Sequence, residues 1–309
     1  DKEALETLRK KLKEFDSRKP EPLPLACTVP DVGPVASPTV VPKGKNAQTV
    51  EPGILSVLDE KPAVIKPVPT APNSTGRRTE LARWLTQSEN PLSTRVIANR
   101  IWQYHFGRGL VASASDFGHL GEKPTHPELL DWLTTQFVKQ GWSFKKLHRL
   151  ILTSATYRQA AVVPTSEVAR LKDPENRLLW RMNTRRLDAE QIRDTVLTAT
   201  GELDLKMGGA AVEYSKPRRT IYSRVTRNIR DPLLEVFDAP DNFFSTAQRN
   251  TTTTPTQALL LINSQMMLQH AKAFAVRLTK EQKGSNEELV TSAYRLTFGR
   301  KPDATELKS

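Results

Sequence analysis

The spacing of apolar residues divides the chain into three regions, the first of which covers residues 1–19. Apolar side chains recur there three or four positions apart on a charged background, a pattern typical of an amphipathic helix. They are Leu5, Leu8, Leu12 and Phe15. Prolines from Pro20 onward end the pattern, because proline lacks the N–H that a helix interior requires. We interpret residues 1–19 as the end of an upstream helical region of a longer protein.

The second region, residues 20–73, is rich in proline. Its apolar residues come in short β-like runs, LACTV, SPTVV and the AVI around Val64, separated by Pro, Gly and Asn. Prolines interrupt these runs too often for a central strand of a sheet. We therefore expect an extended or β segment that packs on the main domain as edge strands.

In the third region, residues 74–309, the apolar residues recur at helical spacing. Ser74 or Thr75 is expected to cap a first helix that runs through Leu85. Further helices are expected over 91–106, 124–140, 144–158, 176–182, 188–200, 255–278 (continuous or a broken pair) and 287–298. Residues 219–227 instead alternate, which predicts a strand.

These patterns predict a mainly α fold class. The main helical domain is expected to contain αα-hairpins, and a small peripheral β component is expected from residues 25–70 and 218–227. A membrane-spanning helix needs about 18 or more consecutive apolar residues. The chain holds no such run, so no transmembrane segment is predicted.

Cysteine usage and the N-terminus limit the chemistry further. The single cysteine, Cys27, excludes an internal disulfide and a cysteine-cluster metal site. The chain also lacks a C-x-x-C-H motif, so we expect no cofactor in this segment. Its first residues are charged and helical and do not resemble a signal peptide, so any export signal is expected upstream.

The charge is strongly positive, +12 over 309 residues, and arginines account for much of the clustering. Six arginines lie between Arg77 and Arg108, and residues 216–230 hold six basic side chains and no acid. The candidate binding residues from these two clusters are Arg100, Arg108, Arg219 and Arg224. Arginine binds carboxylates, sulfates and phosphates through two parallel hydrogen bonds. The cluster therefore suits an anionic polymer or an acidic protein, but arginine–carboxylate bracing inside the fold explains it equally well.

The second group of candidates combines histidines with acids. Asp116, His119, His126 and Glu128 lie close together in sequence, and such side chains serve acid–base catalysis or metal binding. Their spacing matches no established motif such as H-E-x-x-H, so no metal ligand is assigned. His105 is a further binding candidate, because a neutral imidazole can ligate a haem carried by another domain. Structural or surface histidines are the competing interpretation.

A basic hairpin raises a third class of function. The helices expected over 124–140 and 144–158 flank a Gly-Trp-Ser turn, and the second of them carries Lys145, Lys146 and Arg149. Such a face suits a phosphate backbone. A recognition helix, however, offers short polar side chains near its start, whereas this helix begins with Phe144. An ordinary αα-hairpin is favoured over nucleic-acid binding.

Several strings resemble a known family. They include NPLSTRVIANRIWQYHFGRGLV, THPELLDWL, GWSFKKLHRLILTSATYRQ, RRLDAEQIRD and TTTPTQALLLIN. From about Thr28 to Arg300 the chain resembles the family catalogued as domain of unknown function 1553, whose members are common in planctomycetes and allied bacteria. The resemblance implies an exported, multidomain protein, an extracytoplasmic location (periplasmic or cell surface), and an upstream cytochrome c-like or helical domain as partner, with c-type haem in that domain. It implies no catalytic residues.

Three functions follow, in order of preference. The first is a non-catalytic docking, scaffold or ligand-binding module that works beside a cytochrome c-like domain. The second is an enzyme that acts on a surface polysaccharide through a His/Asp/Glu site. The third is nucleic-acid binding through the basic hairpin.

Overall fold

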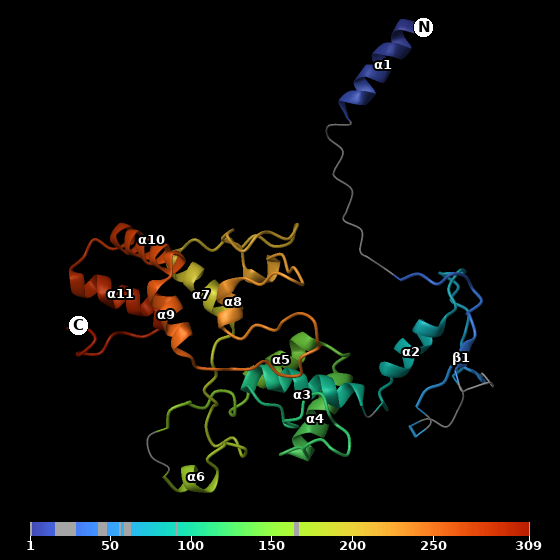
Figure 1. Cartoon of the computed structure of the whole chain (residues 1–309), viewed down its shortest axis with the longest axis horizontal. Coiled ribbons are helices and arrows are strands. Elements are labelled where there is room, and N and C mark those ends of the chain that lie inside the picture. The colour runs from blue at the N-terminus through green and yellow to red at the C-terminus, as the bar shows by residue number, and fades with distance from the viewer. Residues whose placement is uncertain are drawn as a thin grey trace. The chain divides into compact units, whose positions relative to one another are not determined.

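The computed structural model describes residues 2–15, 29–42, 48–55, 57–58, 63–90, 92–163 and 167–308. The chain divides into two compact units, Asp1–Asn90 and Pro91–Ser309 (Figure 1). Helices dominate the described residues, and one two-stranded sheet is formed among them. The predicted mainly α fold with a small β component is therefore confirmed. The predicted division at residues 19 and 73 stays a prediction.

The described residues of the first unit form two helices and the sheet. They are α1 (Lys2–Glu14), β1 (Thr39–Val41), β2 (Gln48–Val50) and α2 (Arg77–Leu85). The strands are antiparallel, with Thr39 opposite Val50. The SPTVV run therefore forms the predicted strand, whereas the AVI around Val64 does not. Most of LACTV, including Cys27, lies outside the described residues.

The start of α2 differs from the prediction. Gly76 is the N-cap, with a φ of 77° that favours glycine. Ser74 and Thr75 both bind Asp31, and the Thr75 hydroxyl also accepts weakly from the Arg77 N–H, at 3.4 Å. The Ser74 hydroxyl and the Thr75 backbone N–H each donate to the Asp31 carboxylate at 2.8 Å. These hydrogen bonds hold the pKa of Asp31 below its ordinary value. The carboxylate thus ties an extended segment to the start of α2.

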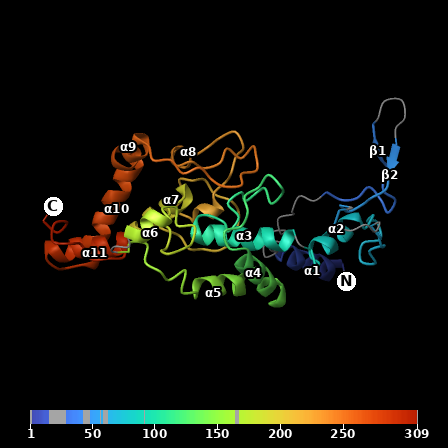
Figure 2. The same ribbon diagram turned by 90° about the horizontal axis from the view of Figure 1, so that it is seen from below.

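In the second unit, three helices form a first group, α3 (Ser93–Phe106), α4 (Pro127–Lys139) and α5 (Phe144–Leu152). They pack in sequence order, α3 on α4 and α4 on α5, side by side in Figures 1 and 2. Ser143 caps α5 by accepting from the Lys146 N–H, so the predicted αα-hairpin is formed. The core consists of Ala98, Ile101, Trp102, Phe106, Leu110, Val111, Leu130, Leu133, Phe137, Leu147 and Ile151.

Two residues direct the chain as it leaves α3. The amide of Asn99 is buried, and it donates to the Val111 carbonyl at 3.0 Å and accepts from the Val111 N–H at 2.8 Å. Gly107 ends the helix at a φ of 83°, a conformation that glycine adopts without strain. A Cβ on Gly107 would also lie 2.9 Å from Cδ of Arg185. Glycine therefore lets a distant arginine cross the end of α3.

The remaining helices of the second unit are α6 (Glu167–Lys172), α7 (Ala189–Thr200), a 3-10 turn (Thr220–Tyr222), α8 (Pro232–Val236), α9 (Pro255–Asn263), α10 (Gln265–Glu281) and α11 (Asn286–Phe298). Helix α10 packs against α7, α9 and α11. The predicted helix over 255–278 is a broken pair, because Ser264 is both the C-cap of α9 and the N-cap of α10. A small core joins α7 to α8 through Ala189, Leu233, Leu234 and Phe237.

Two predicted elements are wrong. Residues 176–182 form turns, not a helix, and Asn176 and Leu179 adopt positive φ angles of 55° and 57°. Residues 218–227 form no strand. The Thr220 N–H donates to the Asp194 carboxylate at 2.8 Å, so a side chain occupies a donor that a strand partner would need. No described helix is long and apolar enough to cross a bilayer.

Candidate anion-binding pocket

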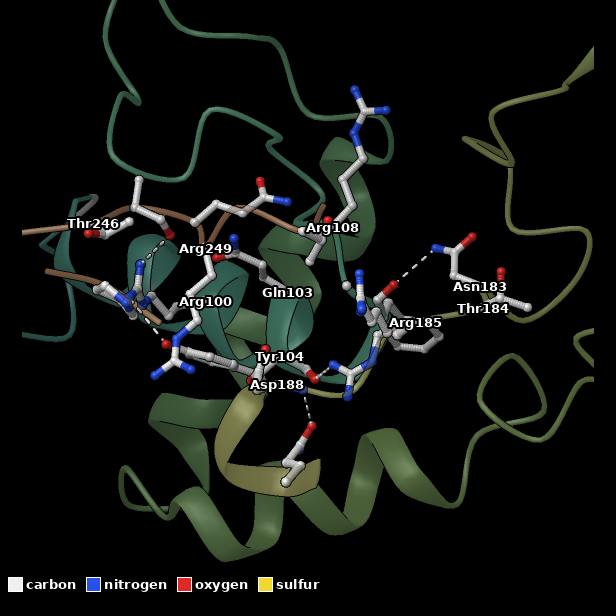
Figure 3. Close-up of a pocket in the computed structure, with 18 of the residues that line it drawn as sticks. Arg100, Gln103, Tyr104, Arg108, Asn183, Thr184, Arg185, Asp188, Thr246 and Arg249 are labelled. Carbon is white, nitrogen blue, oxygen red and sulfur yellow. Dashed lines mark hydrogen bonds between the residues drawn. The ribbon is translucent and has the colours of Figure 1, made fainter. Parts of the chain in front are cut away.

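A cavity of about 680 Å³ lies in the second unit. Most of its wall comes from the second half of α3 with the two residues after it, from residues 181–191 and from the loop 240–251, and Glu175 completes it (Figure 3). Its lining includes six arginines and two acids. The arginines are Arg100, Arg108, Arg181, Arg185, Arg186 and Arg249, and the acids are Glu175 and Asp188. We call this cavity the anion-binding pocket.

Helix α3 contributes one face of the pocket, because Arg100, Gln103 and Tyr104 lie three and four residues apart. The guanidinium of Arg100 donates to the Ala247 carbonyl at 2.9 Å and to the Tyr104 hydroxyl at 3.2 Å. It also lies over the Tyr104 ring, 5.4 Å from the centroid. Arg100 thus fixes the loop 240–251 against α3. The Tyr104 side chain remains 61% exposed.

The segment that carries Arg181, Arg185 and Arg186 is held by amide side chains. Asn176 donates to the Arg181 carbonyl at 2.8 Å and to Asn183 at 2.7 Å. Asn183 in turn donates to the carbonyl of Phe106, the last residue of α3, at 3.0 Å. The guanidinium of Arg185 donates to the Tyr104 carbonyl, as Figure 3 shows. These contacts fasten the arginine-rich segment to the end of α3.

The pocket holds more positive charge than its own acids balance. Arg108 reaches Glu122 and Glu175 at 3.3 and 3.4 Å. Arg249 pairs with Glu190 through two hydrogen bonds of 2.6 and 2.8 Å. The other four guanidiniums form no ion pair within the described part of the chain. They bind neutral carbonyls, hydroxyls, amides and aromatic faces, which satisfy their hydrogen bonds but not their charge.

The ion pair of Glu190 and Arg249 lies at the start of α7, because Glu190 is in the first turn of this helix. Burial would raise the pKa of Glu190, but the hydrogen bonds and charge of Arg249 outweigh burial and lower it. The same hydrogen bonds raise the pKa of Arg249. Both groups therefore stay charged, and Arg249 has one carboxylate partner that an incoming anion would have to share.

Gln103 lines the pocket, but its Oε1 atom is buried and has no hydrogen-bond partner among the described residues. The residue is 7% exposed. A buried acceptor without a partner costs roughly 1–3 kcal/mol. A ligand in the pocket would reach this atom only after the side chain rotates.

Comparison with known proteins identifies the family. Residues 77–309 match the model of PSD1, described as a protein of unknown function (DUF1553). The chain belongs to the PSD1 family. The predicted membership of the family of unknown function 1553 is thereby confirmed over residues 77–309. No curated protein and no solved structure matches the chain.

Only two of the residues predicted for a site line the pocket of this PSD1 chain, Arg100 and Arg108. Arg219 lies beside Asp194 at 4.0 Å and lines a second cavity. Arg224 forms an exposed ion pair with Glu213 at 3.2 Å. The two predicted arginine clusters therefore lie in different parts of the fold, and only the first contributes to the pocket.

His105 lies next to the pocket residue Tyr104 but contacts other groups. Its Nε2 lies 2.8 Å from Nδ1 of His148, and its ring meets the Tyr157 ring edge-on, with centroids 5.6 Å apart. Burial, followed by the charges of His148 and Arg185, lowers the pKa of His105. This histidine pair is held within the packing of the first helical group.

The four acid and histidine candidates do not form a cluster. Asp116 accepts from the Gly118 N–H at 2.8 Å, and His126 contacts Thr125 at 3.0 Å at the start of α4. His119 and Glu128 are exposed. Across the described ranges, no group of three or more His, Cys, Asp or Glu side chains could hold a metal ion. Proximity in sequence did not become proximity in space.

Sequence reasoning missed four pocket arginines of this PSD1 chain. Three of them fall in the string RMNTRR, Arg181, Arg185 and Arg186, and this density was a usable signal. No local density of arginines marked Arg249. It is a single arginine in the sequence QRN, far along the chain from α3. Only the fold brings that loop to the pocket.

Proposed function

We propose that this PSD1 chain is a non-catalytic ligand-binding module that binds the anionic group of a polymer or an acidic partner in the anion-binding pocket. The observation that carries the proposal is the set of four guanidiniums without acidic partners, Arg100, Arg181, Arg185 and Arg186. Fixed positive charge around a concave site attracts and orients anions. The cavity volume also falls within the range of ordinary ligand sites.

The arginines support the proposal by being held in place before any ligand arrives. Arg100 and Arg185 are held by carbonyl oxygens of the loop 240–251 and of α3, and Arg186 donates to Gln257 at 2.6 Å. Side chains that are already ordered lose less conformational freedom on binding. A fork held through one edge still presents other N–H groups to an anion.

The test is a titration of the purified chain with sulfate, phosphate and glucuronate at two salt concentrations. Binding is expected at low ionic strength and should weaken steeply as salt rises, because screening reduces the attraction. The double variant Arg100→Gln/Arg181→Gln should lower the affinity by at least about tenfold, which corresponds to about 1.4 kcal/mol. Calorimetry would measure both effects.

Arg158→Gln is the matched control. Arg158 is exposed and does not line the pocket, so its loss changes the net charge without changing the site. The single changes Arg100→Gln and Arg181→Gln are compared with it. If all three lower the anion affinity equally, net charge alone explains the effect and the proposal is contradicted. The absence of anion binding at low salt would contradict it as well.

The cellular setting is part of the same proposal. Its support is the family resemblance, which implies an exported multidomain protein with a neighbouring cytochrome c-like domain. An extracytoplasmic anionic polymer or an acidic face of that neighbour would then supply the ligand. Fractionation of cells that produce the full-length protein would test the location, and recovery in the cytoplasm would contradict it.

A further inference from the structure

A second cavity of about 780 Å³ borders the anion-binding pocket. The two share Asp188, Gln191 and Arg249, which lie at and near the start of α7. A third, smaller cavity of about 100 Å³ also includes Arg249. Arg249 therefore lines all three cavities, and a ligand longer than one unit could extend along it from the first cavity to the second.

The second cavity differs from the pocket in charge. Its lining carries three acids, Asp188, Glu190 and Asp194, and only two cations, Arg219 and Arg249. The Asp194 carboxylate accepts from the Thr220 hydroxyl at 2.6 Å. It also lies 3.7 Å from Arg193 and 4.0 Å from Arg219, and Arg249 pairs with Glu190, so both cations of this cavity already have an acidic partner. A second anionic group would find no cation without an acidic partner here, whereas an uncharged group rich in hydroxyls would find acceptors.

The second cavity also offers hydroxyl groups next to apolar surface. Thr195 and Thr198 line it from exposed positions on α7, whereas the hydroxyl of Ser223 is buried. Exposed Ile221 and Val225 line the same cavity. In the pocket, exposed Tyr104 and Phe244 stand among the arginines. A sugar ring has a hydroxyl-bearing edge and an apolar face, so it matches both kinds of surface.

We infer that the pocket and the second cavity form one cleft for an acidic oligosaccharide in which acidic and uncharged sugar units alternate. The acidic unit occupies the pocket, and the uncharged unit occupies the second cavity. This inference rests on the proposed anion binding and names its ligand class. A nucleic acid or an acidic peptide with charge on successive units would place a second charge in a cavity whose two cations, Arg219 and Arg249, already pair with Asp194 and Glu190.

The test compares ligands of different length and charge pattern. Glucuronate probes the pocket alone, and a hyaluronan tetrasaccharide adds uncharged N-acetylglucosamine units. Galactose 4-sulfate and a κ-carrageenan tetrasaccharide give the same comparison for sulfate. Each alternating tetrasaccharide is expected to bind roughly tenfold or more tightly than its acidic monosaccharide, because the added units gain contacts in the second cavity. A tetragalacturonate, charged on every unit, should gain less than about threefold over galacturonate.

A variant that fills the second cavity separates the two proposals. Thr195 lines that cavity from an exposed position on α7. Thr195→Trp should abolish the gain with length and leave glucuronate binding unchanged. Thr135→Trp, at an exposed position on α4 outside both cavities, is the matched control and should change neither.

The outcomes are distinct. If glucuronate binds but the tetrasaccharide binds no more tightly, the extended cleft is overturned and the pocket proposal stands. The same holds if Thr195→Trp leaves the higher affinity for the tetrasaccharide intact. Tighter binding of tetragalacturonate or tetra-aspartate than of the alternating sugars would overturn the inferred ligand class. If no acid, monomeric or oligomeric, binds at low salt, both proposals fail.

Discussion

Arg193 and Arg100 both donate to backbone carbonyls, but they differ in what remains available to a ligand. Arg193 is 8% exposed, and its guanidinium reaches the carbonyls of Tyr214, Lys216 and Arg218 and the hydroxyl of Thr220. Arg100 is half-buried, and reaches one carbonyl and one hydroxyl from the wall of an open cavity. The first arginine braces a loop, whereas the second has donors to spare.

The comparison shows that a cluster of arginines in sequence does not reveal its role. Burial lowers the pKa of Arg193, although the nearby charges of Asp194 and Asp231 oppose that shift. A buried guanidinium is tolerated because so many acceptors converge on it. The number of acceptors and the degree of burial therefore separate a bracing arginine from a binding one.

The largest expected effect comes from Arg193→Met. It should destabilise the chain by about 3 kcal/mol or more, because several acceptors that bind a charged donor lose it at once. Urea unfolding would measure the change in the free energy of unfolding. Arg100→Met is the control within the comparison and should cost less than about 1 kcal/mol while weakening anion binding. Equal losses of stability would erase the distinction between the two arginines.

A smaller effect is expected from Glu190→Gln. The substitution keeps an acceptor for Arg249 but removes the carboxylate charge, so Arg249 becomes available to an anion in the pocket. The affinity for glucuronate should rise about three- to tenfold, or roughly 1 kcal/mol. Calorimetry on both proteins would show it. Unchanged or weaker binding would mean that Arg249 belongs with Arg193 as a brace.

The sequence predicts local structure well where the signal is periodic. The apolar spacing that defines α3, α4 and α11 arises within each helix, so a single sequence carries it. The strand predicted over 218–227 does not form, because the segment pairs with other residues only through isolated bridges, such as Val212 with Ser223. Contacts from Asp194 and Arg193 on α7 decide that segment instead.

The candidate site was less predictable, since it is assembled from distant segments. Arg100 and Arg108 were found because they lie in a basic cluster. Arg249 was not, because its place depends on the loop 240–251 folding against α3. Conversely, His105 and His148 are far apart in sequence yet lie 2.8 Å apart. Tertiary contacts of this kind leave no periodic trace in one chain.

His105 reports on the pocket charge through a modest dependence on pH. Its pKa lies below the ordinary 6.5, owing first to burial and then to the charges of His148 and Arg185. The folded state therefore binds fewer protons than the unfolded state near that pH, and stability falls as pH drops through about 6.5. The effect should be below about 1 kcal/mol, since the ring is only partly buried.

An NMR titration would follow the His105 ring. A glucuronate bound near Arg185 should raise the pKa of His105 toward its ordinary value, because the anion offsets the guanidinium charge. His105→Gln should flatten the dependence of stability on pH in this range. A pKa that does not move on saturation with the anion would place the bound charge away from Arg185.

The smallest expected effect belongs to Arg224. Its ion pair with Glu213 joins two exposed side chains at 3.2 Å, and such pairs contribute roughly 0–1 kcal/mol. Arg224→Gln should therefore change the free energy of unfolding by less than about 0.5 kcal/mol and leave glucuronate binding unchanged. Urea unfolding and calorimetry test both statements. A loss of binding would show that anions are drawn by the second basic cluster as well, and that the distinction between spare and engaged donors does not decide where they bind.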